Sequence, residues 1–278
     1  MDERNNSVSA RMSNRLITIA NMLGQSSSLK GKEIFSEGEL TSALVADVGC
    51  DHGYISIYLV QSGIANSAIA MDVRKGPLAG AENNIREFGL GDKISTRLSD
   101  GLKELKPYEA DAAVIAGMGG KLMIKILQEG RVRDLGLKQA ILQPQSDICE
   151  FREYLRIENF VILDEEVVFE DGKYYFPMRV AFLTPVEEKK NVFLNEAIDK
   201  LVEMSHCDRE SANRICNRFG EHNILKASSL LRDYLRHGEE VSKSILETLD
   251  KDSHMERIKV LEKELSDIRS VLCLYEDK

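Results

Sequence analysis

Five short apolar runs alternate with helical stretches in the first half of the chain, and this alternation is the feature that most restricts its fold. Each run is rich in small or β-branched apolar residues, and helical spacing of apolar residues follows it. A strand that is repeatedly followed by a helix is typical of a parallel, doubly wound α/β sheet. We expect the five strands at residues 43–48, 67–71, 94–98, 112–116 and 139–142.

Two further β-rich runs, at residues 160–169 and 174–183, follow this pattern. The residues between them include Asp171 and Gly172, and an Asp-Gly pair between two strands indicates a hairpin turn. We therefore expect two adjacent antiparallel strands to finish the sheet. A dinucleotide-binding sheet normally continues with parallel strands, so this ending favours the Rossmann-like sheet of class I methyltransferases.

The C-terminal third of the chain has no strand signal and shows helical periodicity. A break at residues 250–254 separates two apolar stripes, and Ser253 with Glu256 fits the capping box that starts a helix. We predict a helical hairpin here, with a methyltransferase domain and N-terminal helix at residues 1–185 and a helical coiled-coil domain at 186–278. The second stripe steps by three and four positions, as in a coiled-coil seam, through Ile258, Leu261, Leu265, Ile268 and Leu272.

The composition of the 278 residues restricts the location and the chemistry of the protein. No run of 18 apolar residues offers a membrane span, and no apolar segment with a cleavage site stands near the start. The five cysteines are odd in number, scattered and without a Cys-x-x-Cys pair, which argues against a disulfide framework or a zinc site. We expect a cytoplasmic protein that neither enters a membrane nor binds a metal.

The turn after the first predicted strand has the sequence VADVGCDHGY, residues 45–54. Small residues there let the backbone turn sharply against a ligand. The dinucleotide fingerprint G-x-G-x-x-G has a glycine at the position of Asp51, where a carboxylate would repel a pyrophosphate. Asp47 and Asp51 instead suit a ligand with positive charge, and S-adenosylmethionine carries a sulfonium and an ammonium group but no phosphate.

Acidic residues also stand at the ends of the next two predicted strands, Asp72 after AIAM and Asp100 after TRLS. A carboxylate at the end of the second strand can accept both ribose hydroxyls, and one at the end of the third can accept the adenine amino group. Each residue by itself is more often a helix cap or a turn former. Three acidic strand ends at the ligand-binding edge of one sheet predict a nucleoside-type cofactor.

The fourth predicted strand leads into IAGMGGKLM, residues 115–123, with three glycines in four positions directly before a helix. This loop is either a tight strand-to-helix turn or a floor beneath a transferred methyl group, where only backbone fits. It lacks the Asn-Pro-Pro-aromatic run of exocyclic-amine methylases. It also has no cysteine that could add to a pyrimidine ring.

The charge is distributed unevenly along the chain. With 37 basic and 46 acidic residues the net charge is −9, which counts against a polyanionic partner. The segment from Arg4 to Lys32 nevertheless contains five basic residues and no acidic one. Arg11 and Arg15 lie one turn apart on a predicted N-terminal helix. This segment is either a phosphate-binding surface or a solvated charged face.

Six segments, taken in order, resemble the bacterial tRNA (adenine-22-N1)-methyltransferase family, known as TrmK. They are RLITIANML, ADVGCDHGY, AMDVRKGPL, RLSDGL, VIAGMGGKLM and ILQPQ, and the resemblance spans Arg11 to Leu183. It implies a Rossmann-like domain with a C-terminal coiled coil and S-adenosyl-L-methionine as the cofactor. It also implies methyl transfer to N1 of an adenine in the D-arm of tRNA.

The motifs and the resemblance together suggest candidate residues for three roles. The residues expected at the cofactor are Asp47, Gly49, Cys50, Asp51, Gly53, Asp72, Val73, Asp100, Gly101, Ala116 and Gly117. Those expected at the reacting atoms are His52, Tyr54, Met118, Gly119 and Gln143. Those expected to contact tRNA phosphates are Arg11, Arg15, Lys30, Lys32 and Lys75.

Other functions stay open at this point. The chain could be a class I methyltransferase of a small molecule or protein whose helical module only dimerises, or a non-catalytic RNA-binding module. An NAD-dependent oxidoreductase is disfavoured because Asp51 interrupts the phosphate-binding glycines. The sequence leaves the oligomeric state open, with a monomer slightly favoured.

Overall fold

The computed structural model describes residues 7–24, 35, 42–183, 191–250 and 253–276. The chain separates into two compact units, residues 1–190 and 191–278. The predicted boundary, between residues 185 and 186, falls in a segment outside the described residues. Each unit is treated separately below.

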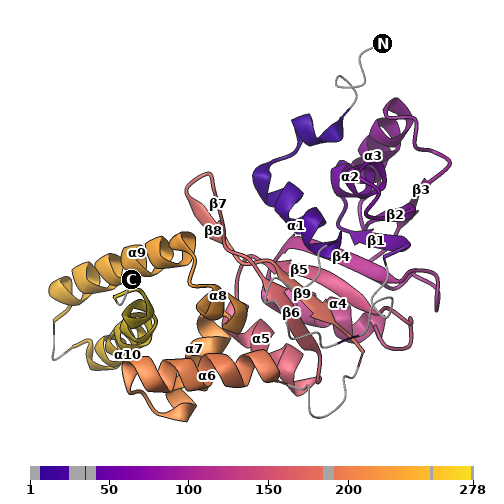
Figure 1. Cartoon of the computed structure of the whole chain (residues 1–278). Helices are drawn as coiled ribbons and strands as arrows, with labels where there is room; N and C mark the ends of the chain where they lie inside the picture. The colour runs from indigo at the N-terminus through magenta and orange to yellow at the C-terminus, as the bar shows by residue number, and fades with distance from the viewer. Residues whose placement is uncertain (1–6, 25–34, 36–41, 184–190, 251–252, 277–278) are drawn as a thin grey trace. The chain divides into compact units, whose positions relative to one another are not determined.

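The first unit is built on a seven-stranded sheet of order β3-β2-β1-β4-β5-β9-β6 (Figure 1). The first five strands are parallel, and β9 is antiparallel to both of its neighbours, β5 and β6. The expectation of a parallel sheet with an antiparallel end is confirmed. The strands are β1 (Leu44–Val48), β2 (Ser67–Asp72), β3 (Ile94–Leu98), β4 (Ala112–Met118), β5 (Gln139–Pro144), β6 (Val161–Glu165) and β9 (Met178–Ala181).

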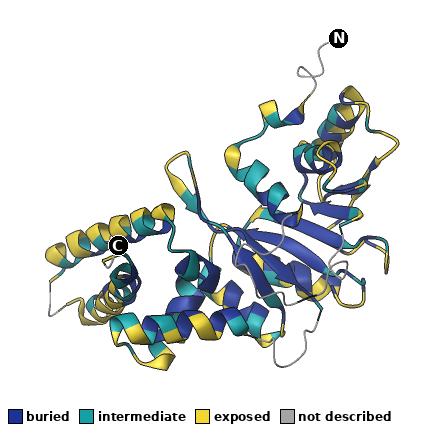
Figure 2. Cartoon of the chain, viewed as in Figure 1, coloured by how far each residue is buried: buried dark blue, intermediate teal, exposed yellow. Residues whose placement is uncertain are grey.

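Helices cover both faces of this sheet, which is why its central strands are apolar on both sides. One face packs on α4 (Gly120–Gly130) and α5 (Ile148–Ile157) through Ala46 and Val48 of β1. Val45 of the same strand points to the other face, where the remaining helices pack. Figure 2 shows the strands of the sheet as mostly buried. The helices of that second face are α1 (Asn14–Gly24), α2 (Tyr54–Gln61) and α3 (Lys75–Glu87).

The predicted hairpin turn is present, but each of the two predicted long strands is divided in two. Between β6 and β9 the chain forms a separate two-stranded ribbon, β7 (Val168–Glu170) and β8 (Lys173–Tyr175). Asp171 and Gly172 both have positive φ, at +49° and +74°, as a type I′ turn requires. The hairpin therefore lies beyond the sheet rather than within it.

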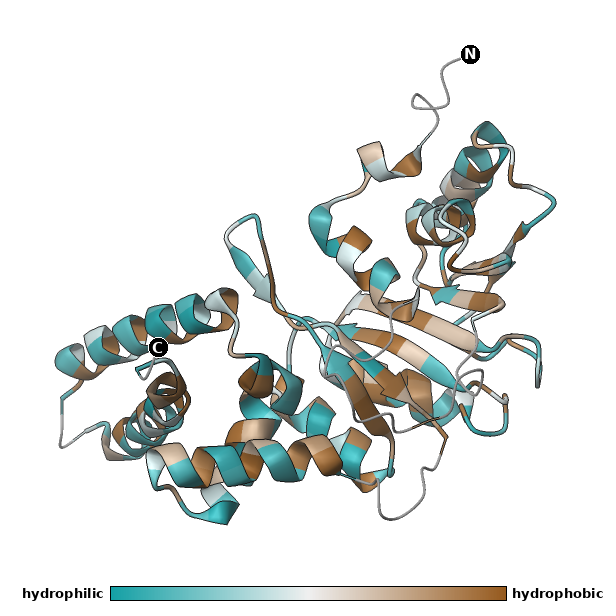
Figure 3. Ribbon diagram, viewed as in Figure 1, coloured by the Kyte–Doolittle hydropathy of each residue, from teal (hydrophilic) through white to brown (hydrophobic). Residues whose placement is uncertain are grey.

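The second unit is entirely helical over its described residues. Figure 3 shows apolar stripes along its helices, and the predicted seam residues Leu261, Leu265 and Ile268 are buried. The last long helix packs on α6 as well as on α9, so its apolar face lies in a small bundle and not only in a two-helix seam. The helices are α6 (Val192–Ser205), α7 (Arg209–Phe219), α8 (Glu221–Lys226), α9 (Ser229–Thr248) and α10 (Met255–Leu272).

The predicted capping box before α10 is wrong. The residue that precedes the helix is His254, and no side chain caps it. The Asp250 carboxylate instead accepts both the hydroxyl of Ser253, at 2.6 Å, and its amide, at 3.0 Å. The two bonds close a local turn, so the Ser253 side chain is not available to cap the helix.

A buried ion pair supports the antiparallel end of the sheet, and its contribution to stability can be tested by substitution. Arg152 and Glu165 are fully buried, with Nε and Oε1 2.8 Å apart. We expect Glu165→Gln to lower the free energy of unfolding by about 3–5 kcal/mol, because it removes the charge that pairs with Nε of a buried guanidinium. Lys121, whose side chain is 74% exposed, forms a surface ion pair with Asp147. Lys121→Gln should lower the free energy of unfolding by only about 0–1 kcal/mol. Urea unfolding of both variants measures the difference, and equal losses would contradict the assignment.

Candidate functional site

A cavity of about 460 Å³ opens at the carboxyl ends of β1, β2 and β4. The strand order changes direction between β1 and β4, which is where open α/β sheets bind ligands. The volume suits a small molecule of nucleoside size. The lining residues are Arg15, Leu16, Asp47, Val48, Gly49, Cys50, Asp51, His52, Tyr54, Ile55, Asp72, Val73, Arg74, Ser99, Asp100, Gly101, Ala116, Gly117, Met118, Leu122, Ile126 and Gln145.

The turn after β1 forms the floor of this cavity. Gly49 has φ of +76°, and its amide donates to the carbonyl of Met71 at 2.8 Å. A Cβ atom at Gly49 would lie 2.4 Å from Cε of Met118, so a side chain here would strain the backbone and push the end of Met118 aside. Gly53, expected at the cofactor, does not line the cavity, because it faces Ala81 of α3, 3.1 Å from where its Cβ would be. Its role is to let α2 and α3 approach each other.

Asp47 joins the cavity to the first turn of α2. Its side chain is almost fully buried, and its Oδ2 accepts the amide of Ser56 at 3.2 Å and the hydroxyl of Ser56 at 2.7 Å. Gly53, which precedes α2, offers no side-chain cap, so Asp47 supplies one from the neighbouring strand. Burial raises the pKa of Asp47 to about 6, against the lowering effect of the two Ser56 bonds.

The two other acidic strand ends differ in their surroundings. Asp72 is buried, and its Oδ1 accepts the amide of Arg74 at 2.8 Å. Asp100 is 59% exposed at the rim, where Lys103 donates to it at 2.5 Å and lowers its pKa. The fold thus brings all three predicted carboxylates to one cavity, with Asp47 and Asp72 in the interior and Asp100 at the edge.

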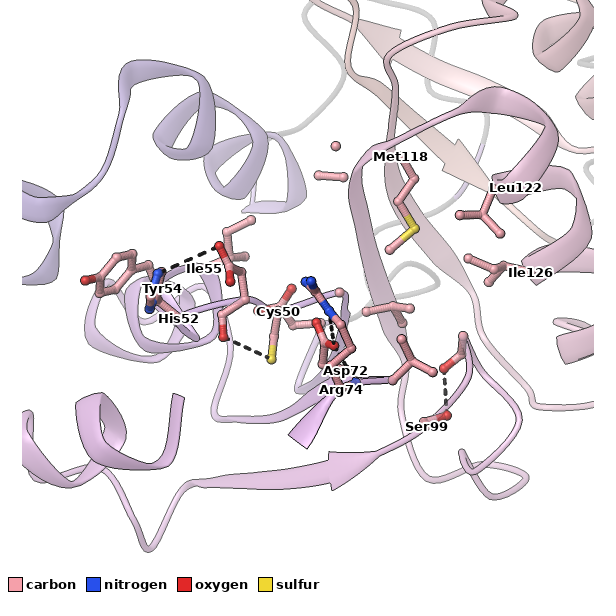
Figure 4. A pocket seen from close by; sticks show the side chains of 18 of the residues that line it. Cys50, His52, Tyr54, Ile55, Asp72, Arg74, Ser99, Met118, Leu122 and Ile126 are labelled. Carbon is pink, nitrogen blue, oxygen red and sulfur yellow. Dashed lines mark hydrogen bonds and ion pairs between the residues drawn. The ribbon is translucent and has the colours of Figure 1, made fainter. Parts of the chain in front are cut away.

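Aromatic and apolar side chains face one another across the cavity in Figure 4. His52 and Tyr54 stack with ring centroids 5.5 Å apart and planes at 29°. His52 is 58% exposed, with Nε2 3.9 Å from Asp51. Met118 and Leu122 stand on the opposite side. The cavity mouth is therefore flat and partly aromatic on one side and apolar on the other.

Cys50 also lines the cavity, and its thiol is mostly buried. Burial raises its pKa, and the nearby carboxylates of Asp47 and Asp72 raise it further. The thiol therefore stays protonated and acts as a packing group rather than as a nucleophile.

Two residues predicted at the reacting atoms lie outside the cavity wall. Gln143 is fully buried behind it, where Oε1 accepts Arg15 Nη1 at 2.7 Å, and Gln145 lines the cavity in its place. Gly119 packs against the loop after β5, with its Cβ position 3.0 Å from Oγ of Ser146. The sequence motif located the correct loops, but the side-chain directions within them depend on the fold.

Arg15, predicted on the surface, is a residue of the cavity wall. Its side chain is 18% exposed, its amide donates to Glu170 at 3.0 Å, and its guanidinium lies 4.9 Å from the Tyr175 ring centroid. Arg11 is exposed but forms an ion pair with Glu87. Both arginines thus have partners within the protein, and their role as phosphate contacts stays a prediction.

The other three basic residues predicted to contact phosphate have different outcomes. Lys75 is exposed at the start of α3 and does not line the cavity. Lys30 and Lys32 lie outside the described residues.

Several lining residues were not predicted, although their positions carried a signal. Arg74 stands two residues after the end of β2 and Ser99 directly after β3, at the same sheet edge as the predicted residues. Leu122 and Ile126 are one turn apart on α4, so helical spacing after the glycine loop would have indicated them. Leu16 and Ile55 lie on helices whose packing on the sheet only the tertiary structure defines.

The fold and the cavity define a Rossmann-like domain with acidic residues where a dinucleotide site would have phosphate-binding glycines, which is the class I methyltransferase type. The family described as "Methyltransferase domain" matches residues 33–178, and the chain belongs to it. No described helix has the length and the low charge that crossing a bilayer requires. No cluster of three or more His, Cys, Asp or Glu residues among the described ones could hold a metal ion.

Individual relatives agree with this assignment. The chain is 41% identical over 133 residues to the tRNA (adenine(22)-N(1))-methyltransferase of Bacillus subtilis, a stretch that covers 48% of this chain and 56% of that protein. It is 32% identical over 171 residues to a curated Mycoplasma pneumoniae protein, a stretch that covers 61% of this chain and 71% of that protein. The resemblance found in the sequence is thus confirmed, although the alignment spans little more than half of the Bacillus protein.

Solved structures resemble the chain over nearly its whole length. The B. subtilis m1A22 tRNA methyltransferase TrmK superposes with a TM-score of 0.71 at 26% identity, over 94% of this chain and 98% of that one. Streptococcus pneumoniae Sp1610 in complex with S-adenosyl-L-methionine gives 0.70 at 27% identity, over 94% and 99%.

The raised pKa of Asp47 predicts a pH-dependent stability. Between the ordinary value of 3.8 and about 6 the folded protein binds more protons at this group than the unfolded chain, so the free energy of unfolding falls as pH rises through this window. Asp47→Asn removes the titration. We expect the stability of the variant relative to wild type to increase by up to about 3 kcal/mol from pH 4 to 6 and then to level off.

Asp51→Asn is the matched control, because Asp51 stands in the same turn but is 67% exposed. Urea unfolding at several pH values gives the free energy of unfolding of the wild type and of both variants. Difference curves of the same shape for the two variants would show that burial does not perturb Asp47.

Proposed function

We propose that the protein transfers a methyl group from S-adenosyl-L-methionine to N1 of an adenine in tRNA, at position 22 of the D-arm. One observation carries the proposal. A cavity with two interior carboxylates lies at the switch point of the sheet, in a chain that is 41% identical over the aligned stretch to a tRNA (adenine(22)-N(1))-methyltransferase. No other substrate class has comparable support.

The residues of the cavity fit this cofactor. Asp47 and Asp72 are buried carboxylates that favour a ligand with positive charge, and Gly49 leaves space that a Cβ would fill. Asp72 has its Oδ1 engaged by Arg74, so its Oδ2 is the atom to accept ribose hydroxyls. Asp100 and Gly101 at the end of β3 would meet the adenine, with Val73 and Ile126 against its faces.

Methyl transfer places few chemical demands on the protein. The bound cofactor supplies an electrophilic methyl group on a sulfonium, and adenine N1 has a free lone pair at neutral pH. No strong base is needed, so the residues act mainly by orientation, an effect worth about 7–11 kcal/mol in well-aligned systems. The backbone at Ala116 and Gly117 would form the floor at the reacting atoms, with Met118 beside it.

The target adenine would enter between the two sides of the mouth. A paired base cannot present N1, so it must be unpaired or flipped out of its stem. The stacked rings of His52 and Tyr54 offer an aromatic face to such a base, and Gln145 offers an amide that can bond its edge. These three residues are the candidates for holding the adenine.

The tRNA backbone would be held by basic residues outside the cavity. Lys75, Lys30 and Lys32 stay candidates for phosphate contacts, whereas Arg15 has a structural place in the wall. We also propose a cytoplasmic location, because none of the five cysteines forms a disulfide bond in the described residues, as is usual in a reducing compartment.

The reaction is tested with methyl-labelled S-adenosylmethionine and unmodified tRNA transcripts. We expect label in the wild-type transcript, recovered as 1-methyladenosine after nuclease digestion and mass spectrometry, and none in a transcript with adenine 22 replaced. Label in both transcripts would refute the site. Cofactor binding without any labelled tRNA would refute the substrate and favour a methyltransferase of a small molecule or protein.

The tight approach at Gly49 predicts a selective loss of cofactor binding. Gly49→Ala should weaken S-adenosylhomocysteine binding, measured by calorimetry, by at least about tenfold, because the added methyl displaces Met118 from the floor. Gly63→Ala is the matched control, since Gly63 also has positive φ, at +72°, but nothing within 4 Å of its Cβ position. Both variants should show similar backbone strain of about 1–2 kcal/mol. Equal affinities in the two variants would contradict the assignment.

A further inference from the structure

The β7–β8 hairpin has two chemically different faces. Its register pairs Val168 with Tyr175 and Phe169 with Tyr174. Side chains alternate along a strand, so Phe169 and Tyr174 share one face, while Tyr175 lies with Glu170 on the other. The two faces therefore have separate partners.

The inner face is fixed to the wall of the cavity. Glu170 accepts the amide of Arg15 at 3.0 Å, and its second oxygen lies 3.5 Å from the guanidinium. The same guanidinium lies 4.9 Å from the Tyr175 ring centroid, and Arg15 itself lines the cavity. An isolated two-stranded ribbon is at best marginally stable, so these contacts hold the hairpin at the site.

The outer face carries two aromatic side chains in contact, Phe169, which is exposed, and Tyr174, which is half-buried. The ring centroids of Phe169 and Tyr174 are 4.6 Å apart, with planes at 46°. Phe169 is 47% exposed, and Figure 2 shows the end of the hairpin as exposed. The two rings are in contact and tilted against each other, and the exposed ring of Phe169 provides an aromatic face on which a nucleobase can stack.

The charges of the hairpin favour a base over a phosphate as its ligand. The carboxylate of Glu170 is compensated by Arg15, and the turn carries one acidic and one basic residue, Asp171 and Lys173, both exposed. The aromatic face is thus close to neutral. Phosphate binding needs an excess of positive charge, whereas stacking needs only an aromatic surface.

We propose that Phe169 and Tyr174 form a stacking surface for an unpaired nucleobase of the RNA substrate, a neighbour of the base that enters the cavity. This rests on the proposed function, and it identifies how the RNA is held beside the site. Flipping one base out of a stem exposes the faces of the bases next to it. An aromatic surface anchored to the cavity wall would cover such a face and offset the lost stacking.

A fluorescent variant tests contact directly, because the chain contains no tryptophan. The 278-residue chain with Phe169→Trp is titrated with the unmodified tRNA transcript in the presence of S-adenosylhomocysteine. We expect its emission to be quenched in a saturable way, as base stacking quenches indole. Tyr108→Trp is the control, because Tyr108 is 82% exposed and is absent from the cavity lining, so its emission should change little. Unchanged emission of Phe169→Trp with bound tRNA would overturn the proposal.

A second pair of variants separates stacking from structure. The double variant Phe169→Leu and Tyr174→Leu keeps apolar bulk but removes both rings, and its Kd for tRNA should rise roughly 5- to 150-fold. Its affinity for S-adenosylhomocysteine should stay at the wild-type value, and Phe169→Trp should retain tight tRNA binding. An unchanged Kd for the double variant would overturn the proposal.

The outcomes for this surface and for the proposed reaction are distinct. Quenching and ring-dependent binding without formation of 1-methyladenosine by the wild-type protein would support the surface and refute the reaction. Formation of 1-methyladenosine with neither effect would support the reaction and refute the surface.

Discussion

The bond between Asp47 and the first turn of α2 is the contact on which the site depends. A buried carboxylate at the end of β1 accepts both the amide and the hydroxyl of Ser56, which fixes where the helix begins. The turn between them, with Gly49 at its start, is thereby held in the sharp conformation that forms the cavity floor. The same carboxylate also lines the cavity, so Asp47 both caps α2 and contributes a charged group to the cavity wall.

Arg15 connects this floor to the outer parts of the unit. It lies on α1, bonds Gln143 at the end of β5 and pairs with Glu170 of the β7–β8 hairpin. Residues from three distant parts of the sequence therefore meet at one guanidinium beside the cavity. A side chain that the charge pattern placed on a basic surface instead organises the wall and the hairpin that projects from it.

The regular elements of the sheet were predictable because their signals are local. The strand at 94–98 was predicted with its observed bounds, and the Asp171-Gly172 turn follows from backbone preferences alone. The acidic strand ends were also predictable, since parallel strands bring their carboxyl ends to one edge. Side-chain direction at the end of β5 was not, as Gln143 and Gln145 show, and neither was the local turn that Asp250 and Ser253 form before α10.

The sequence by itself determined the order of strands and helices, the glycine turn and the positions of Asp47, Asp72 and Asp100 at strand ends, because these depend on short-range periodicity and backbone geometry. The tertiary structure alone decided which of these groups are buried and what they contact. Burial depends on how α1, α4 and the hairpin pack against the sheet, over separations that no local pattern encodes. That packing raises the pKa of Asp47, turns Arg15 inward and leaves Phe169 exposed.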